Sequence, residues 1–262
     1  MIEVKGLNAG FRGVDVIHDI TFSIDSPGVT GLIGPNGSGK STLLKALAGV
    51  HDFTGEALYD GHPLASLPRR KRVKQLSYVA QHSGPAIPLK VREVVELGRT
   101  AGRGPFATPD AEDEAIVVKA LTHTDLTDLS ERRLSELSGG QVQRAMVARA
   151  MAQHATHMLL DEPTNHLDPR HQYKLMEILR HLGDEHHTAV VLALHNLELA
   201  ARYCDRLIVL QAGSVIADGL PDDILTPDLL RQVFGVRGEL TTTDHGETVL
   251  AIRGPIDSDY LQ

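Results

Sequence analysis

The sequence predicts an α/β protein with a mainly parallel β-sheet. Short apolar segments at 157–160 and 189–194 resemble buried strands, and they alternate along the chain with longer segments of helical periodicity. The N-terminal segments 2–4 and 22–24 instead alternate apolar and polar residues, as strands of an antiparallel sheet do. A third observation is a complete strand, glycine loop and helix within residues 28–50.

Composition limits the size and class of the protein. The chain has 262 residues, of which 42% are hydrophobic and 23% charged, so it is long enough for an α/β domain with an inserted subdomain. A net charge of −8 argues against general binding of nucleic acid. We interpret the densest basic run, residues 69–72, as a solvated helix face or turn. The single cysteine, Cys204, excludes an intrachain disulfide and fits a reducing compartment.

The chain shows no targeting or membrane-spanning pattern. Its N-terminus, MIEVKGLNAG, lacks the apolar segment of a signal peptide. The longest apolar runs are far shorter than the roughly twenty residues that a membrane helix requires. We therefore expect a cytoplasmic chain that reaches any membrane through a partner.

The first 65 residues predict an N-terminal sheet and one helix. The helix follows the glycine loop and has Gly49 as a plausible stop. Residues 55–64 predict a hairpin with its turn at Asp60 and Gly61.

Helical patterning dominates residues 88–137. Segments 91–99 and 111–126 both carry apolar residues at three- and four-residue spacing, with an expected loop at 102–109. We interpret this stretch, extended to about residue 150, as a helical subdomain inserted into the α/β domain.

Strands and helices alternate again after Gly140. An amphipathic helix, a strand at 157–160, a helix at 172–182 and a strand at 188–195 precede a hairpin with its turn at Ala212 and Gly213. Residues 238–262 give no readable pattern. We therefore assign 1–237 to one α/β domain and leave 238–262 as a tail of unknown role.

The glycine loop matches the phosphate-binding motif G-x-x-x-x-G-K-S in full. It follows a predicted strand and opens a predicted helix, which is the context that the motif requires. Glycines allow backbone N–H groups to approach a phosphate, and the helix N-terminus adds positive potential. Lys40 would contact the β- and γ-phosphates, and Ser41 would offer its hydroxyl to Mg²⁺. The nucleotide-binding candidates in this loop are Gly34, Pro35, Asn36, Gly37, Ser38, Gly39, Lys40, Ser41 and Thr42.

Two acids follow the strand at 157–160. Asp161 would hold Mg²⁺, and Glu162 would polarise the attacking water in phosphoryl transfer. An Asp-Glu pair at a strand end is by itself common, but downstream of a phosphate loop it indicates an NTP-hydrolysing site.

Three further residues are candidates, each with a simpler alternative. His195 is either an ordinary end-of-strand residue or a donor to the γ-phosphate. Gln81 is either a surface glutamine or a catalytic ligand near Mg²⁺ and the attacking water. Phe11 is either a core aromatic or a stacking partner for adenine. The residues alone leave these alternatives open.

A second glycine loop lies about a hundred residues after the first. Ser138, Gly139 and Gly140 precede a predicted helix, so a phosphate would fit there, yet the loop has no lysine. Ser138 is also a good helix cap, and capping does not compete with a phosphate role.

These motifs, in this order, resemble the ATP-binding-cassette (ABC) ATPases, a branch of the P-loop NTPases. LSGGQ at 137–141 is that family's signature, and it occurs here with GPNGSGKST, LLDEP and NHLD, with Gln81 and His195 at matching positions. The match covers about residues 11–235. It implies a P-loop NTPase core with an antiparallel β subdomain and a helical subdomain.

The resemblance also implies why one chain has two glycine loops. In the family, two copies pack head to tail with two ATP molecules between them, so the P-loop of one copy and the second loop of the other enclose each nucleotide. Lys40 of one copy then serves a loop that has no lysine of its own. The residues expected to reach ATP across this interface are Ser138, Gly139, Gly140, Gln141 and Asp168.

The implied partners are a second copy or a sister ATPase, and a membrane permease. Segments such as LKVREVVELGR and GRTAGRGPF are similar to the ATPases of iron-siderophore, haem and vitamin B12 importers, with the siderophore branch nearest. An extracytoplasmic binding protein would then deliver the cargo. The alternatives are an ATPase for haem, cobalamin, metal-ion import or export, and a soluble ATPase acting on nucleic acid or ribosomes.

Overall fold

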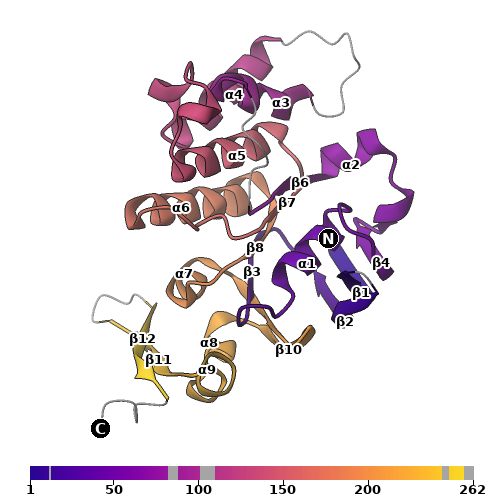
Figure 1. Cartoon of the computed structure of the whole chain (residues 1–262), viewed down its shortest axis with the longest axis vertical. Helices are drawn as coiled ribbons and strands as arrows, with labels where there is room; N and C mark the ends of the chain where they lie inside the picture. Colours follow the sequence, from indigo (N-terminus) through magenta and orange to yellow (C-terminus); the bar gives the residue numbers. More distant parts are fainter. Residues whose placement is uncertain (12, 82–87, 101–109, 244–247, 257–262) are drawn as a thin grey trace.

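The computed structural model describes residues 1–11, 13–81, 88–100, 110–243 and 248–256. Within these residues, a six-stranded sheet forms the centre, in the order β10-β9-β3-β8-β7-β6 (Figure 1). Every neighbouring pair in it is parallel except β9 and β10. Its strands are β3 (Gly28–Ile33), β6 (Leu76–Val79), β7 (His157–Leu160), β8 (Ala189–Ala193), β9 (Arg206–Gln211) and β10 (Ser214–Gly219). The predicted mainly parallel sheet is confirmed.

A separate antiparallel sheet forms from the N-terminal part of the chain. It contains β1 (Ile2–Phe11), β2 (Val14–Ile24), β4 (Thr54–Tyr59) and the short β5 (His62–Pro63). β1 and β2 pair antiparallel, as the alternating pattern predicted, and Ile2 lies opposite Ile24. Asp60 and Gly61 both have positive φ, at 50° and 76°, which is the backbone that a tight hairpin turn requires.

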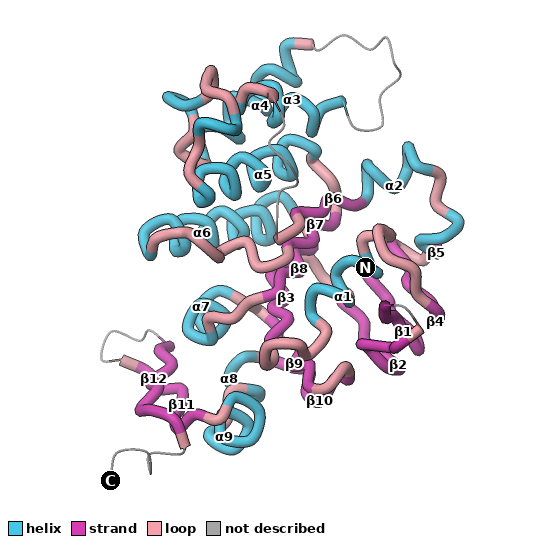
Figure 2. The backbone as a smooth tube through the Cα atoms, viewed as in Figure 1, coloured by secondary structure: helices cyan, strands magenta, loops and turns pink. Residues whose placement is uncertain are grey.

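Both faces of the six-stranded sheet are buried, which explains why its strands are apolar throughout. On β8, Val190 and Leu192 face one apolar cluster, whereas Val191 and Ala193 face the other. Figure 2 shows α5 (Gly139–Gln153), α6 (Pro169–His186) and α7 (Leu197–Tyr203) on one side of the sheet, and α1 (Lys40–Leu47) with the N-terminal sheet on the other.

Three helices form the helical part of the molecule, at the top of Figure 1. These are α3 (Val91–Thr100), α4 (Ala111–His123) and α5, and they pack on one another. The predicted helix at 91–99 is confirmed, and so is the one predicted at 111–126, although α4 ends at His123. The predicted loop at 102–109 lies outside the described residues. The basic run at 69–72 begins the exposed helix α2 (Arg69–Gln75), as expected for a solvated helix.

The C-terminal part has more structure than the sequence indicated. After α8 (Pro221–Ile224) and α9 (Pro227–Phe234), β11 (Val236–Thr242) and β12 (Thr248–Pro255) pair as an antiparallel hairpin. This hairpin packs against α7 and α9, at the bottom of Figure 1. In the described part of the chain, no helix combines the length and hydropathy needed to span a membrane.

Candidate functional site

Sheet topology gathers the predicted site residues. The glycine loop follows β3, Asp161 follows β7, His195 comes two residues after β8, and Gln81 comes two residues after β6. These four strands are neighbours and run parallel, so their carboxyl ends meet at one edge. Ligands of open α/β sheets bind at this edge.

The glycine loop is held in a conformation that only glycine allows at two positions. Gly34 has φ 150°, and a Cβ there would lie 2.1 Å from the carbonyl oxygen of Leu210. Gly39 has φ 104°, and a Cβ there would lie 2.4 Å from Cγ2 of Ile17. Close packing against β9 and β2 therefore fixes the loop before any ligand arrives.

Lys40 places a buried cation inside this loop. Its Nζ donates to the carbonyl oxygens of Gly34, at 2.8 Å, and Pro35, at 3.0 Å, and only 4% of the residue is exposed. Burial lowers the pKa of the ammonium, although the carboxylates of Glu162 and Asp161 oppose that shift. Among the described residues, no carboxylate forms an ion pair with Lys40. An ammonium with only neutral hydrogen-bond partners is well placed to receive an anion.

A cavity of about 160 Å³ lies beside Lys40. It is lined by Val16, Asn36, Gly37, Ser38, Gly39, Lys40, Ser41, Thr42, Glu162 and His195. The structure thus joins most of the glycine loop with two of the predicted catalytic residues. Val16 was not predicted, because nothing in the sequence separates it from any other residue of its strand.

Asp161 and Ser41 form an oxygen donor set at the floor of the site. The Ser41 hydroxyl donates to Oδ1 of Asp161 at 2.7 Å, and Asp161 is fully buried. Oδ2 of Asp161 has no hydrogen-bond partner among the described residues. Burial raises the pKa of Asp161, and the Ser41 hydrogen bond opposes that rise. A buried carboxylate oxygen without a partner, next to a hydroxyl, fits a hard cation such as Mg²⁺.

Glu162 is the centre of a hydrogen-bond network. Gln81 and Asn165 both donate side-chain amide N–H groups to Oε2 of Glu162, and Nε2 of His195 hydrogen-bonds to Oε1. Glu162 is 8% exposed and has φ 51°, a strained backbone typical of functional sites. The structure therefore brings together all three predicted catalytic residues. Asn165 was not assigned a role, although its spacing of three residues from Glu162 was a usable signal.

Phe11 does not line the cavity beside Lys40. Its ring lies 4.4 Å from the His51 ring, centroid to centroid, and the residue is 49% exposed. The predicted stacking of Phe11 on adenine stays a prediction.

The second glycine loop lies apart from this cavity. Ser138 caps α5, with its Oγ accepting from the N–H of Gln141 at 3.4 Å, and a Cβ added at Gly139 would meet no described heavy atom within 4 Å. Asp168 caps α6 and its side chain is 59% exposed. The backbone N–H of His171, followed by its side chain, lowers the pKa of Asp168. Ser138, Gly139 and Asp168 face solvent, and none of them lines the cavity beside Lys40.

We predict that Ser41→Ala lowers the free energy of unfolding by about 1–3 kcal/mol at pH 8, because it leaves the buried Asp161 carboxylate without its donor. The loss should shrink at pH 5. The pKa of Asp161 is raised, and a larger share of this group is protonated and neutral at the lower pH. Urea unfolding at the two pH values measures both quantities.

Ser38→Ala is the matched control for Ser41→Ala. The Ser38 hydroxyl is also buried in the glycine loop, but it has no hydrogen-bond partner among the described residues. Its removal should change the unfolding free energy by less than about 0.5 kcal/mol. Equal losses for the two variants would contradict the role given to the Ser41 bond.

The chain matches known proteins over most of its length. The family model described as ABC transporter matches residues 17–165. Cobalamin import ATP-binding protein BtuD of Halobacterium salinarum is 40% identical over 90% of this chain, which spans 59% of that longer relative. Probable siderophore transport system ATP-binding protein YusV of Bacillus subtilis is 35% identical, over 92% of this chain and 88% of the relative. Hemin import ATP-binding protein HmuV of Pseudomonas entomophila is 38% identical, over 90% and 93%.

Solved structures agree with the fold. A metal-chelate type ABC transporter in an inward-facing conformation matches with a TM-score of 0.79 and 25% identity, over 96% of each chain. A dimeric cassette in a post-hydrolysis state, bound to ADP and phosphate, matches with a TM-score of 0.76 and 28% identity, over 84% of this chain and 99% of that one. The chain belongs to the ABC transporter family, and its fold is that of the family's ATPase subunits.

Proposed function

We propose that two copies of this chain close around two ATP molecules, hydrolyse them, and thereby drive a membrane permease that imports an iron chelate. The observation that carries the ATPase part is the shared strand edge, where Lys40, Ser41 and Glu162 line one cavity. Asp161 lies behind Ser41 and accepts a hydrogen bond from its hydroxyl. The transport part is supported by the names of the relatives, which are ATP-binding proteins named for cobalamin import, siderophore transport and hemin import.

Lys40 and the loop around it would bind the phosphates of ATP. The buried ammonium is held between two carbonyl oxygens, so it needs little reorganisation when an anion enters. Asn36 to Thr42 line the cavity and include the first turn of α1, which begins at Lys40 and whose N-terminus adds positive potential. Ser41 and Asp161 would hold Mg²⁺, which neutralises charge on the phosphates during transfer.

Glu162 would orient and deprotonate the attacking water. Its carboxylate is fixed by Gln81, Asn165 and His195, so the orientation of the acceptor oxygens does not depend on the substrate. His195 lines the cavity and is about one-third exposed, so its ring can also reach a terminal phosphate. Gln81, whose amide donates to Glu162, would lie near Mg²⁺ and the attacking water.

The second loop would complete the site of the other copy. Ser138 and Gly139 are exposed at the N-terminus of α5, where backbone N–H groups face solvent and favour an anion. A terminal phosphate bound to Lys40 of one copy would satisfy these groups on the other. Asp168, exposed at the start of α6, would contact the same interface.

We assign the cargo to iron chelates, with the siderophore branch first. Haem, cobalamin and metal ions are the alternatives, since the relatives named for different cargoes are similarly identical to this chain. The ATPase would sit at the cytoplasmic face of the membrane, held there by permease subunits. In this proposal residues 1–237 are the ATPase domain, with the helical subdomain at about 88–150 against the permease and 238–262 as an appended segment.

We predict that Glu162→Gln keeps ATP binding but lowers turnover by about 100-fold or more, because an amide cannot accept the proton of water. Size-exclusion chromatography of the variant with saturating MgATP should show a dimer that disappears without nucleotide. A monomer under saturating MgATP would count against closure around ATP.

The same substitution tests the cargo in cells. Cells that carry Glu162→Gln should lose uptake of a labelled ferric siderophore and keep uptake of labelled haem and cobalamin. The wild-type gene supplied on a plasmid is the control and should restore uptake. Unchanged siderophore uptake, in a strain without a second siderophore importer, would refute the iron-chelate assignment and leave the ATPase proposal intact.

We predict that Ser138→Arg lowers the ATPase rate by about tenfold or more, since a bulky cation at the second loop prevents two copies from closing. Each copy should still bind ATP, as measured with a fluorescent ATP analogue. Ser135→Arg, an exposed position three residues earlier, is the matched control and should hydrolyse ATP normally. Normal hydrolysis by Ser138→Arg would be incompatible with a role for the second loop in trans.

A further inference from the structure

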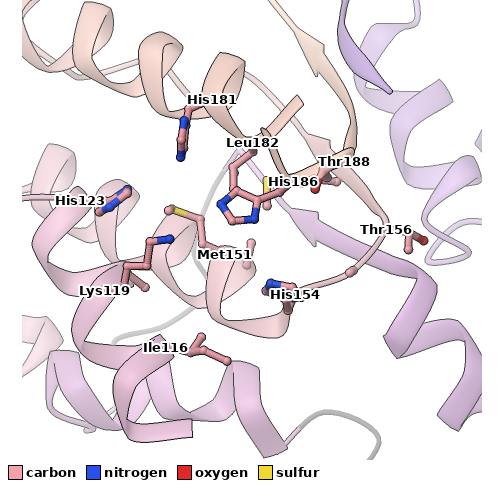
Figure 3. Close-up of a pocket in the computed structure, with 14 residues that line it drawn as sticks. Ile116, Lys119, His123, Met151, His154, Thr156, His181, Leu182, His186 and Thr188 are labelled. Atoms are coloured by element: carbon pink, nitrogen blue, oxygen red, sulfur yellow. The ribbon is translucent and has the colours of Figure 1, made fainter. Parts of the chain in front are cut away.

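An open pocket of about 240 Å³ lies between α4, the end of α5 and the end of α6, and Figure 3 shows the residues that line it. α5 and α6 lie on the opposite side of the six-stranded sheet from α1 (Figure 2). The pocket shares no lining residue with the cavity beside Lys40. Its floor is apolar and includes the buried residues Ala120, Ala150 and Met158. An apolar floor with polar groups above it is the usual form of a small-molecule site.

Basic and imidazole groups from three elements surround this floor. Lys119 and His123 come from α4, one turn apart, and His154 ends α5. His181 and His186 come from α6. Figure 3 shows the Lys119 side chain extending toward the space between these rings.

The four imidazoles form a continuous chain. The ring centroids of His181 and His186 lie 5.4 Å apart, those of His154 and His186 lie 6.1 Å apart, and those of His123 and His181 lie 6.4 Å apart. Within the described residues, no group of three or more His, Cys, Asp or Glu side chains converges closely enough to hold a metal ion. The arrangement therefore suits a ligand larger than a single ion.

The charge of the pocket is opposite to that of the protein. The chain carries a net charge of −8, yet none of the described residues that line the pocket is acidic. Lys174 also acts on His123 from α6, whereas the carboxylate of Glu185 acts on His186 with the opposite sign. An anion would therefore meet mostly favourable charges here.

The imidazoles also disfavour one another's charged forms. Burial first, and then Lys119 and neighbouring histidines, lower the pKa of both His123 and His186. An anion placed among the rings would reverse that effect and raise the pKa of both groups. Binding would then take up protons and strengthen as the pH falls.

We propose that this pocket binds a small organic anion with an apolar body and a carboxylate or phosphate head group. The body would lie on the alanine and methionine floor, and the head group would bond Lys119 and the imidazoles. Because Lys119 belongs to α4 and His181 and His186 to α6, such a ligand would tie the helical part to the core. This site is independent of the proposed transport function.

The test uses matched probes on the full chain. Calorimetric titrations at pH 6.0 and 8.5 compare 2-naphthoate, 2-naphthyl phosphate and the neutral 2-naphthamide. We expect at least one anion to bind about tenfold or more tighter than the amide at pH 6.0, with a smaller ratio at pH 8.5. Whichever anion binds tighter identifies the head group. Equal affinity of both anions and the amide, or no binding at all, would overturn the proposal.

Paired variants locate the binding. Lys119→Gln combined with His186→Gln should weaken anion binding by about tenfold or more and leave amide binding within about twofold. Lys71→Gln combined with His62→Gln removes the same two groups at exposed positions outside the pocket and should bind like the wild type. ATP binding, which uses the other cavity, should be unchanged in both and reports correct folding. Unaltered anion binding in the pocket variant would refute the assignment.

Discussion

The buried ammonium of Lys40 is the constraint on which the rest of the site depends. Gly34 and Gly39 allow the loop to close around it, and β2 and β9 hold that loop from outside. Burial removes water from the Lys40 ammonium and lowers its pKa. The two carbonyl oxygens that accept its hydrogen bonds are neutral. A bound phosphate would supply the negative charge that the present partners of Lys40 lack. Asp161 and Glu162 lie close enough to act on Lys40 electrostatically and form no ion pair with it among the described residues.

The parallel sheet places Asp161 and Glu162, which follow β7, at the same edge as the glycine loop that follows β3. Asp161 and Glu162 are consecutive but have different surroundings: Asp161 is fully buried beside Ser41, whereas Glu162 bonds to Asn165 of its own loop and to Gln81 and His195 from other segments. In the proposed mechanism, Oδ2 of Asp161, which has no partner among the described residues, would bind the cation, and the fixed carboxylate of Glu162 would accept the proton. In a single copy, the second glycine loop caps α5 but does not line the cavity beside Lys40. This is the arrangement expected if the loop completes the ATP site of another copy.

Most of the fold was predictable because period and turn chemistry are local. The antiparallel strands β1 and β2, the turn at Asp60 and Gly61, and the strand–loop–helix around Lys40 all follow from residues close in sequence. The residues that sequence reasoning missed depend on packing between distant segments. Val16 lines the cavity only because β2 crosses the glycine loop, and the mixed, half-buried pattern of β11 hid the C-terminal hairpin. The spacing of Lys119 and His123 was visible, but their approach to His181 on α6 was not.

The central claim is that each ATP site combines the Lys40 loop of one copy with the Ser138 loop of another. Mixing two inactive variants, Lys40→Ala and Ser138→Arg, tests this directly. In a mixed dimer of the proposed form, one site carries both defects and the other carries neither. ATP hydrolysis by the mixture, at a rate well above the sum of the two variants measured alone, is the result that we expect. A mixture that hydrolyses ATP no faster than the separate variants would contradict a site shared between two copies.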